Sequence, residues 1–142
     1  MTLAYFDSSA LVKLVVEEDG SHDVATLWDG ADAVVTSRVA HPEVRAALAS
    51  AHRDQRLDDI GHNAAKQSWR EFHTALRMVE VTEALEDRAG SLAETHALSG
   101  FDAIHLASAL TLAEAPVILA TWDRRLHTAA RTIGITTLPA GP

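Results

Sequence analysis

The chain has 142 residues, of which 47% are hydrophobic, and it contains no cysteine. This length fits a single domain over residues 1–142 that is large enough to bury a core. The absence of cysteine excludes disulfides and thiolate metal sites, so carboxylate and imidazole groups are the available metal ligands. The net charge of −8 argues against broad electrostatic attachment to nucleic acid.

Membrane and export signals are missing from the sequence. No uninterrupted apolar run approaches the roughly 18 residues that a membrane span needs. The first residues, MTLAYFDSS, lack the charged start and the cleavage site of a signal peptide. We therefore expect a cytoplasmic protein that does not associate with membranes.

Short apolar segments alternate with segments of helical periodicity along the whole chain. In chain order, the pattern predicts strand 3–6, helix 9–18, helix 21–30, strand 33–37, helix 41–57, helix 58–76, strand 78–81, helix 83–97, helix 99–113, strand 116–121, helix 123–134 and strand 135–138. Such alternation indicates the α/β class, because parallel strands need crossover connections and their sheet is covered by helices on both faces. In open sheets of this kind, ligands bind beyond the carboxyl ends of the strands, where the strand order reverses.

Acidic residues stand at the ends of strands or the starts of helices. Asp7 follows the first strand and Asp123 follows the fourth, while Glu43 and Asp102 lie near the starts of predicted helices. If the first and fourth strands are neighbours, about 4.8 Å apart, Asp7 and Asp123 are placed to bind one cation together. Each acid is also explained as a helix cap or a favourable first-turn charge. Serine, threonine or asparagine would cap without mutual repulsion, however, and this favours a metal site.

Four stretches carry a resemblance to a known family. The segments YFDSSALVK, HPEVRAAL, SGFDAIHLASAL and ILATWDRRLHTAA, in this order and spacing, resemble the motifs of PIN-domain nucleases, and specifically of VapC-type toxins from toxin–antitoxin systems. The resemblance covers nearly the whole chain. It implies a three-layer PIN-like fold with a five-stranded parallel sheet in the order 3-2-1-4-5.

The resemblance also implies an activity and its residues. The family's acidic positions fall on Asp7, Glu43, Asp102 and Asp123, and the implied reaction is metal-assisted hydrolysis of an RNA phosphodiester. We expect Asp7, Asp102 and Asp123 to bind Mg²⁺, with Mn²⁺ as a substitute, and Glu43 to orient the ion or its water. Many relatives have a further acid after the last motif's aspartate, where this chain has arginines, so we expect one strong metal site.

The implied partners are those of a toxin. The resemblance predicts a homodimer, an RNA substrate and a cognate VapB-type antitoxin with a segment that covers the active site. It further predicts that promoter DNA is bound by the toxin–antitoxin complex, mainly through the antitoxin. The acidic net charge of this chain is consistent with DNA binding through the antitoxin.

Polar residues beside the acids admit two explanations each. Ser8, Ser9 and Thr121 are expected to hydrogen-bond the carboxylates or a bound water, or simply to cap helices. Arg124 and Arg125 either contact RNA phosphates or belong to a solvated helix face.

Further predictions concern a histidine, a tryptophan and the competing functions. His105, on a mostly apolar helix, is predicted to be a hydrogen-bonded core histidine, and Trp122 is the one aromatic residue proposed for base stacking. Two alternative functions remain open. One is a phosphohydrolase with Asp7 as the nucleophile. The other is a non-catalytic module that binds a metal ion or a peptide.

Overall fold

The computed structural model describes residues 1–112 and 115–141 and contains one five-stranded sheet. All strand pairs are parallel, and the order is β3-β2-β1-β4-β5, which confirms the predicted α/β class and strand order. The strands are β1 (Leu3–Phe6), β2 (Ala33–Ser37), β3 (Arg77–Val79), β4 (Val117–Ala120) and β5 (Thr136–Leu138).

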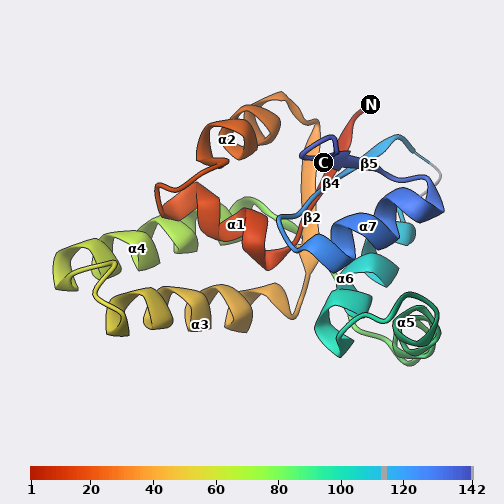
Figure 1. Cartoon of the computed structure of the whole chain (residues 1–142). Helices are drawn as coiled ribbons and strands as arrows, with labels where there is room; N and C mark the ends of the chain where they lie inside the picture. Colours follow the sequence, from red (N-terminus) through yellow and green to blue (C-terminus); the bar gives the residue numbers. More distant parts are fainter. Residues whose placement is uncertain (113–114, 142) are drawn as a thin grey trace.

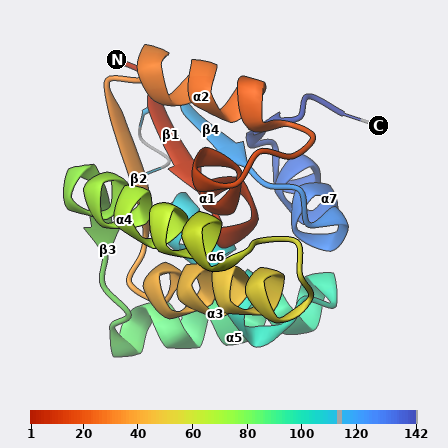
Figure 2. The ribbon, with the colours of Figure 1, turned by 90° about the vertical axis from the view of Figure 1, so that its left-hand side faces the viewer.

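Helices cover both faces of this sheet, so the fold has three layers (Figure 1). They are α1 (Ser8–Val15), α2 (Ser21–Gly30), α3 (Ala40–Arg53), α4 (Asp59–Ala75), α5 (Glu83–His96), α6 (Gly100–Leu110) and α7 (Arg124–Ile133). One face carries α1 to α4 and the other carries α5 to α7, and Figure 2 shows the first group stacked in front of the strands. Among the helices of the described ranges, none combines the length and the apolar character needed to cross a membrane.

Two hydrophobic cores lie on the two faces of the sheet. Successive side chains of a strand point to opposite faces, and accordingly Ala4 and Phe6 of β1 pack in one core while Tyr5 packs in the other. All three are fully buried. Strand β1 is therefore covered on both sides, and its carboxyl end is held rigidly between two cores.

The strand order reverses beside β1. Strands β1 and β4 are direct neighbours, in a register that pairs Leu3 with Val117 and Phe6 with Ala120. The two strands therefore end side by side, and the residues that follow them emerge at the same edge. That edge is the place where open α/β sheets bind ligands.

Several predicted boundaries differ from the structure. The helix expected over 41–57 ends at Arg53, because Gln55 adopts a left-handed conformation with φ of 62° and the N–H groups of Arg56 and Leu57 both turn back to the carbonyl of Ala51. Leu57 thereby packs against the first core. The helix expected over 9–18 ends at Val15, since Val16 is extended.

Other differences are at element ends, and most of them shorten an element by one or two residues. The third strand is shifted from 78–81 to Arg77–Val79, and the helix expected over 99–113 is observed as Gly100–Leu110, with residue 113 lying outside the described ranges. Helix α4 turns one face toward the core. Ala65, Trp69 and Leu76 are buried, and Phe72 packs against the same core.

Candidate active site at the carboxyl edge of the sheet

Asp7 is a buried carboxylate at the end of β1, with 3% of its surface exposed. Its Oδ1 accepts hydrogen bonds from the Ser9 hydroxyl at 2.6 Å and from the backbone N–H of Ala10 at 3.0 Å. The second bond makes Asp7 the N-cap of α1, so the capping explanation is correct. Its Oδ2 accepts the Thr121 hydroxyl at 2.5 Å. The carboxylate is thus oriented by three hydrogen bonds and is fixed in place.

Burial changes the protonation behaviour of this carboxyl group. Desolvation raises the pKa of Asp7 above its ordinary value of 3.8, although the nearby His105 and the hydrogen bonds from Ser9, Thr121 and Ala10 act in the opposite direction. A buried carboxylate is costly unless it is paired with a cation or protonated. A cation bound at this edge of the sheet would therefore stabilise the ionised form of Asp7.

Asp123 is joined to Asp7 through one hydroxyl group. Thr121 donates to Asp7 and its Oγ1 accepts the backbone N–H of Asp123 at 3.0 Å. The Oδ1 of Asp123 accepts the N–H of Leu126 at 2.9 Å, so Asp123 is the N-cap of α7, as the capping explanation also predicts. Strands β1 and β4 are neighbours, as predicted, and the aspartates that follow them both contact the Thr121 hydroxyl.

Asp102 lies in the first turn of α6, but it is not the cap. Ser99 holds that position, and its hydroxyl accepts the backbone N–H of Asp102 at 3.3 Å. The cap explanation for Asp102 is therefore wrong. Desolvation raises the pKa of Asp102, and the negative charges of Asp123 and Asp7 raise it further. The three aspartates consequently lie close enough to repel one another, as expected for a site that attracts a cation.

Glu43 reaches the site from the first turn of α3, on the other side of the sheet. Its Oε1 lies 2.7 Å from Nε2 of His105, whose Nδ1 lies 2.7 Å from the Tyr5 hydroxyl. His105 is 1% exposed, so the prediction of a hydrogen-bonded core histidine is confirmed. The sequence did not reveal that this histidine connects Glu43 to β1.

The donor chemistry of the aspartates fits a hard divalent ion, which takes carboxylate oxygens as ligands. Within residues 1–112 and 115–141, however, no three histidine, aspartate or glutamate side chains are grouped so as to hold a metal ion as they stand. Asp102 and Asp123 are partly exposed, whereas Asp7 is fixed. Coordination of one ion by all three therefore requires the two partly exposed side chains to turn toward Asp7.

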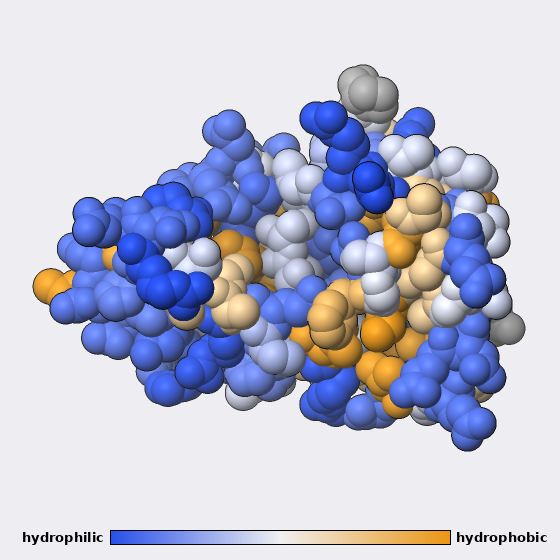
Figure 3. All heavy atoms as spheres, turned by 60° about the horizontal axis from the view of Figure 1, so that its bottom comes forward, coloured by the Kyte–Doolittle hydropathy of each residue, from blue (hydrophilic) through white to orange (hydrophobic). Residues whose placement is uncertain are grey.

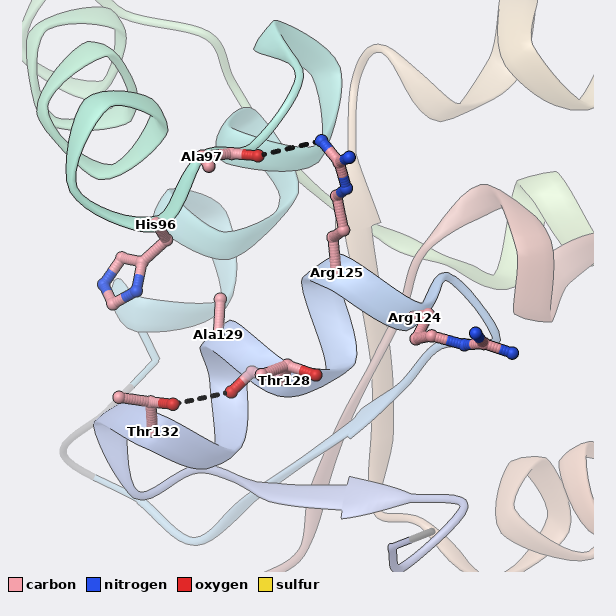
Figure 4. A pocket seen from close by; sticks show the side chains of 7 residues that line it. All are labelled: His96, Ala97, Arg124, Arg125, Thr128, Ala129 and Thr132. Atoms are coloured by element: carbon pink, nitrogen blue, oxygen red, sulfur yellow. Dashed lines mark hydrogen bonds between the residues drawn. The ribbon is translucent and has the colours of Figure 1, made fainter.

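Basic residues line a hollow on α7, the helix that Asp123 caps. The hollow has a volume of about 320 Å³ and lies between the end of α5 and α7, where His96, Arg124 and Arg125 line it (Figure 4). Arg125 points across it toward the carbonyl oxygen of Ala97, at 3.5 Å, whereas Arg124 extends to the other side of α7. Both arginines are exposed, so their guanidinium groups are accessible.

Trp122 forms a wall of the site. Its backbone N–H donates to the Ser9 hydroxyl at 3.0 Å, and the Lys13 ammonium lies 4.9 Å from its ring centroid. Gly20 faces the ring closely enough that a Cβ atom there would lie 2.6 Å from the indole. The indole is therefore held from several sides, and a base would have to stack on its remaining surface.

The hydroxyl groups predicted to contact the acids divide into two kinds. Ser9 and Thr121 both donate to Asp7, which confirms their predicted role. Ser8 begins α1, and in the described part of the chain its hydroxyl makes no hydrogen bond to Asp7. A contact of Ser8 with a bound water or with RNA stays a prediction.

Comparisons with known proteins bear on the family and the fold of the chain. The family model described as "PIN domain" matches residues 4–132. Two curated relatives from Mycobacterium tuberculosis, "Ribonuclease VapC45" and "Ribonuclease VapC49", are each 50% identical over 140 residues, covering 99% of this chain and 97% of the relative.

Two solved structures share the fold. PAE2754 from Pyrobaculum aerophilum has a TM-score of 0.71 and 20% identity, covering 97% of this chain and 90% of its own. A toxin–antitoxin complex from Klebsiella pneumoniae has a TM-score of 0.60 and 19% identity, covering 83% of this chain and 84% of its own. At such identities these likenesses bear on the fold alone.

Proposed function

Because the chain belongs to the PIN domain family, we propose that it is a divalent-metal-dependent endoribonuclease that acts as the toxin of a toxin–antitoxin pair. The relatives that are 50% identical over nearly the whole chain are named as ribonucleases, which supports the activity. The observation that carries the proposal is the site itself. The side chain of Asp7 and the backbone N–H of Asp123 both contact the Thr121 hydroxyl at the edge where the strand order reverses, and the charges of both aspartates raise the pKa of Asp102.

We assign distinct roles to the acids. Asp7, Asp102 and Asp123 hold the ion, which we propose to be Mg²⁺ with Mn²⁺ as a substitute, and Glu43 orients the ion or a water molecule. A bound divalent ion lowers the pKa of a coordinated water and stabilises negative charge on the phosphate and on the leaving oxygen. The protein supplies the placement of Asp7, through its bonds to Ser9 and Thr121, and buries this carboxylate.

RNA phosphates are the groups that Arg124 and Arg125 suit best. Both side chains follow Asp123 directly and are exposed beside the hollow of Figure 4. Guanidinium groups bind phosphate oxygens through paired hydrogen bonds. We propose that these arginines bind phosphates that flank the scissile bond. Trp122, beside Asp123, remains our candidate for stacking on a base.

The partners that we propose are a VapB-type antitoxin and a second copy of the chain. One face of the molecule is hydrophilic on the side of α3 and α4, while apolar atoms gather on the side of α5, α6 and α7 (Figure 3). Phe101, next to Asp102, is 57% exposed. Apolar surface of this kind marks protein–protein contacts. With a net charge of −8, the chain is poorly suited to bind promoter DNA itself, and we propose that DNA is bound through the antitoxin.

We also propose that residues 1–142 form one domain and that the protein works in the cytoplasm, where its RNA substrates are. The two cores share the single sheet, and this supports treating the chain as one folding unit.

The two alternative functions fit the site less well. An aspartyl nucleophile must reach a phosphorus atom, but Asp7 is 3% exposed and both of its oxygens already accept hydrogen bonds. A non-catalytic module that binds a metal ion would use the same aspartates, but it would not need the exposed Arg124 and Arg125 beside them. Neither alternative explains the site as well as phosphodiester hydrolysis does.

The test is cleavage of RNA by the purified, antitoxin-free chain. We expect Mg²⁺- or Mn²⁺-dependent cleavage that stops on addition of a chelator and resumes when the ion is restored in excess. Mapping the RNA ends identifies internal cuts. RNA that stays intact at every Mg²⁺ and Mn²⁺ concentration, while the antitoxin still binds, would establish the binding-module alternative instead.

A further inference from the structure

A fully buried histidine stands behind the acidic site. His105 lies on α6, close to one turn after Asp102, and its ring is packed edge-on against Tyr5 with centroids 5.8 Å apart. Each ring nitrogen has one partner at 2.7 Å: Nδ1 contacts the Tyr5 hydroxyl and Nε2 contacts Oε1 of Glu43. These contacts form a chain of two hydrogen bonds that joins β1, α6 and α3.

The chemistry of the two partners fixes the direction of the bond to Glu43 and allows Tyr5 to donate to Nδ1. An ionised glutamate only accepts hydrogen bonds, so Nε2 must carry a proton and donate to Glu43. A phenol hydroxyl can donate a hydrogen bond, so Tyr5 can donate to Nδ1 at 2.7 Å. A neutral imidazole with its proton on Nε2 satisfies both contacts. No buried side-chain nitrogen or oxygen in the described ranges is left without a partner.

We propose that His105 is a positioning residue for the nuclease reaction, which holds Oε1 of Glu43 and so fixes how the glutamate presents its other oxygen to the ion or water. Tyr5 in turn holds the Nε2–H form of the imidazole. This inference rests on the proposed function. A glutamate side chain has three rotatable bonds, and Glu43 is 23% exposed, so without this contact it would sample several orientations.

The two hydrogen bonds connect Glu43 to the elements next to the proposed metal ligands. Tyr5 stands two residues before Asp7 on β1, and His105 stands three residues after Asp102 on α6. Glu43 comes from a helix on the opposite face of the sheet. The histidine therefore sets the position of Glu43 relative to the two elements that carry the proposed metal ligands.

A purely structural role for His105 makes different predictions. A core histidine that only fills space would affect stability equally whether or not residue 43 is a glutamate. A positioning role predicts that the loss of His105 matters because of Glu43, so the two substitutions should not be additive.

The experiment compares kcat and KM for RNA cleavage by intact variants. His105→Leu should lower kcat about 10- to 100-fold with little change in KM, as is typical when a supporting residue is lost. His105→Gln retains an amide N–H donor for Glu43 and should recover most of that loss. In a Glu43→Gln background, His105→Leu should have little additional effect. Leu106→Ala, at a fully buried neighbour, controls for general destabilisation.

A second measurement does not depend on cleavage. Nitrogen NMR of the imidazole ring in the folded, ion-free chain should show the proton on Nε2, and Tyr5→Phe should weaken that preference while leaving the fold intact. A proton on Nδ1 in the unsubstituted chain would overturn the proposed arrangement.

The outcomes separate this inference from the proposed function. If the unsubstituted chain does not cleave RNA at all, the proposed function fails and the inference fails with it. Two results overturn the inference alone. In the first, the unsubstituted chain cleaves RNA and the His105→Leu variant cleaves it as fast. In the second, the fold-losses in kcat from His105→Leu and Glu43→Gln multiply in the double variant.

Discussion

At the scale of single residues, Asp7 combines a structural role with a charge, and one substitution separates the two. Asp7→Asn keeps an oxygen that can accept from Ser9 and Ala10, so the cap of α1 is preserved. It removes the negative charge that we assign to the metal ion. We expect RNA cleavage to fall at least about 100-fold, measured as initial rates at saturating Mg²⁺, while circular dichroism stays unchanged.

Asp58→Asn is the matched control for this prediction. Asp58 caps α4 in the same way, accepting the N–H of Gly61 at 2.7 Å, but it is exposed and lies away from the site. Its replacement should leave cleavage unchanged. Equal losses of activity in the two variants would show that an Asp→Asn change at any helix cap lowers activity, and that the charge of Asp7 has no specific role in cleavage.

The buried carboxyl groups also predict how stability depends on pH. The folded pKa values of Asp7 and Asp102 are raised above their ordinary value of 3.8, so the folded state binds more protons than the unfolded state between that pH and the folded pKa values. The free energy of unfolding contributed by these groups is therefore fully present below 3.8 and is lost as pH rises.

Thermal unfolding of Asp7→Asn at several pH values checks this prediction. The variant should lose less stability than the unsubstituted chain as pH rises, and it should be at least as stable at neutral pH, because it buries no charge. Added Mg²⁺ should stabilise the unsubstituted chain more than the variant. A variant that is less stable at neutral pH, with the same pH dependence as the unsubstituted chain, contradicts the assignment.

Residue types and their spacing indicated the acids, but not their partners. Asp7 and Asp123 could be placed from the sequence because both directly follow a buried strand. The link from Glu43 through His105 to Tyr5 spans 62 and 100 positions of sequence separation. Neither contact leaves a periodic signal, since each depends on how α3 and α6 pack around the sheet. The apolar surroundings of His105 suggested only that it is buried.

At the scale of elements, the turn between α1 and α2 holds the wall of the site in place. Gly20 has a φ of +93°, and a Cβ atom there would lie 2.6 Å from Cζ2 of Trp122. Gly20→Ala should therefore be destabilising by about 1 kcal/mol from the left-handed backbone alone, and by more because the indole must move. Since Trp122 adjoins Asp123, we also expect slower RNA cleavage by the folded variant.

Substitutions at two other glycines separate backbone strain from the clash with the Trp122 ring. Gly134 also has positive φ, of +98°, but a Cβ atom there meets nothing within 4 Å, so Gly134→Ala tests backbone strain alone. Gly30 lies at the end of α2 with open space around it, and Gly30→Ala should be neutral or stabilising. Urea unfolding ranks the three variants. Gly20→Ala must be the least stable, and it must be the one that also slows cleavage.

Element types were predictable to a greater degree than element ends. The twelve predicted elements all exist, because each apolar pattern is long enough to identify a strand or a helix face. The end of α3 was missed because the sequence after Arg53 keeps helical composition. What ends that helix is the return of Leu57 to the core and the cap that Asp58 provides for α4, which are both tertiary effects.

At the scale of the whole molecule, the order β3-β2-β1-β4-β5 depended on the family resemblance, whereas alternation alone predicted a parallel sheet without an order. The charge of −8 presents a different question, because an acidic protein must still bind a polyanion. The structure places exposed Arg124 and Arg125 next to Asp123. Local positive charge, and not the net charge, should therefore control the affinity for RNA.

Salt dependence measures how many phosphates the protein contacts. Log affinity for single-stranded nucleic acid falls with log salt concentration by about 0.7 for each phosphate neutralised. Arg124→Gln and Arg125→Gln should each weaken the binding of a short RNA in chelator and reduce this slope by about 0.7. Arg70→Gln makes the same change in net charge on α4, across the sheet from α7 (Figure 1), and should leave the slope unchanged. If it weakens binding as much as the other two, overall charge governs the affinity and the arginines beside Asp123 have no specific role.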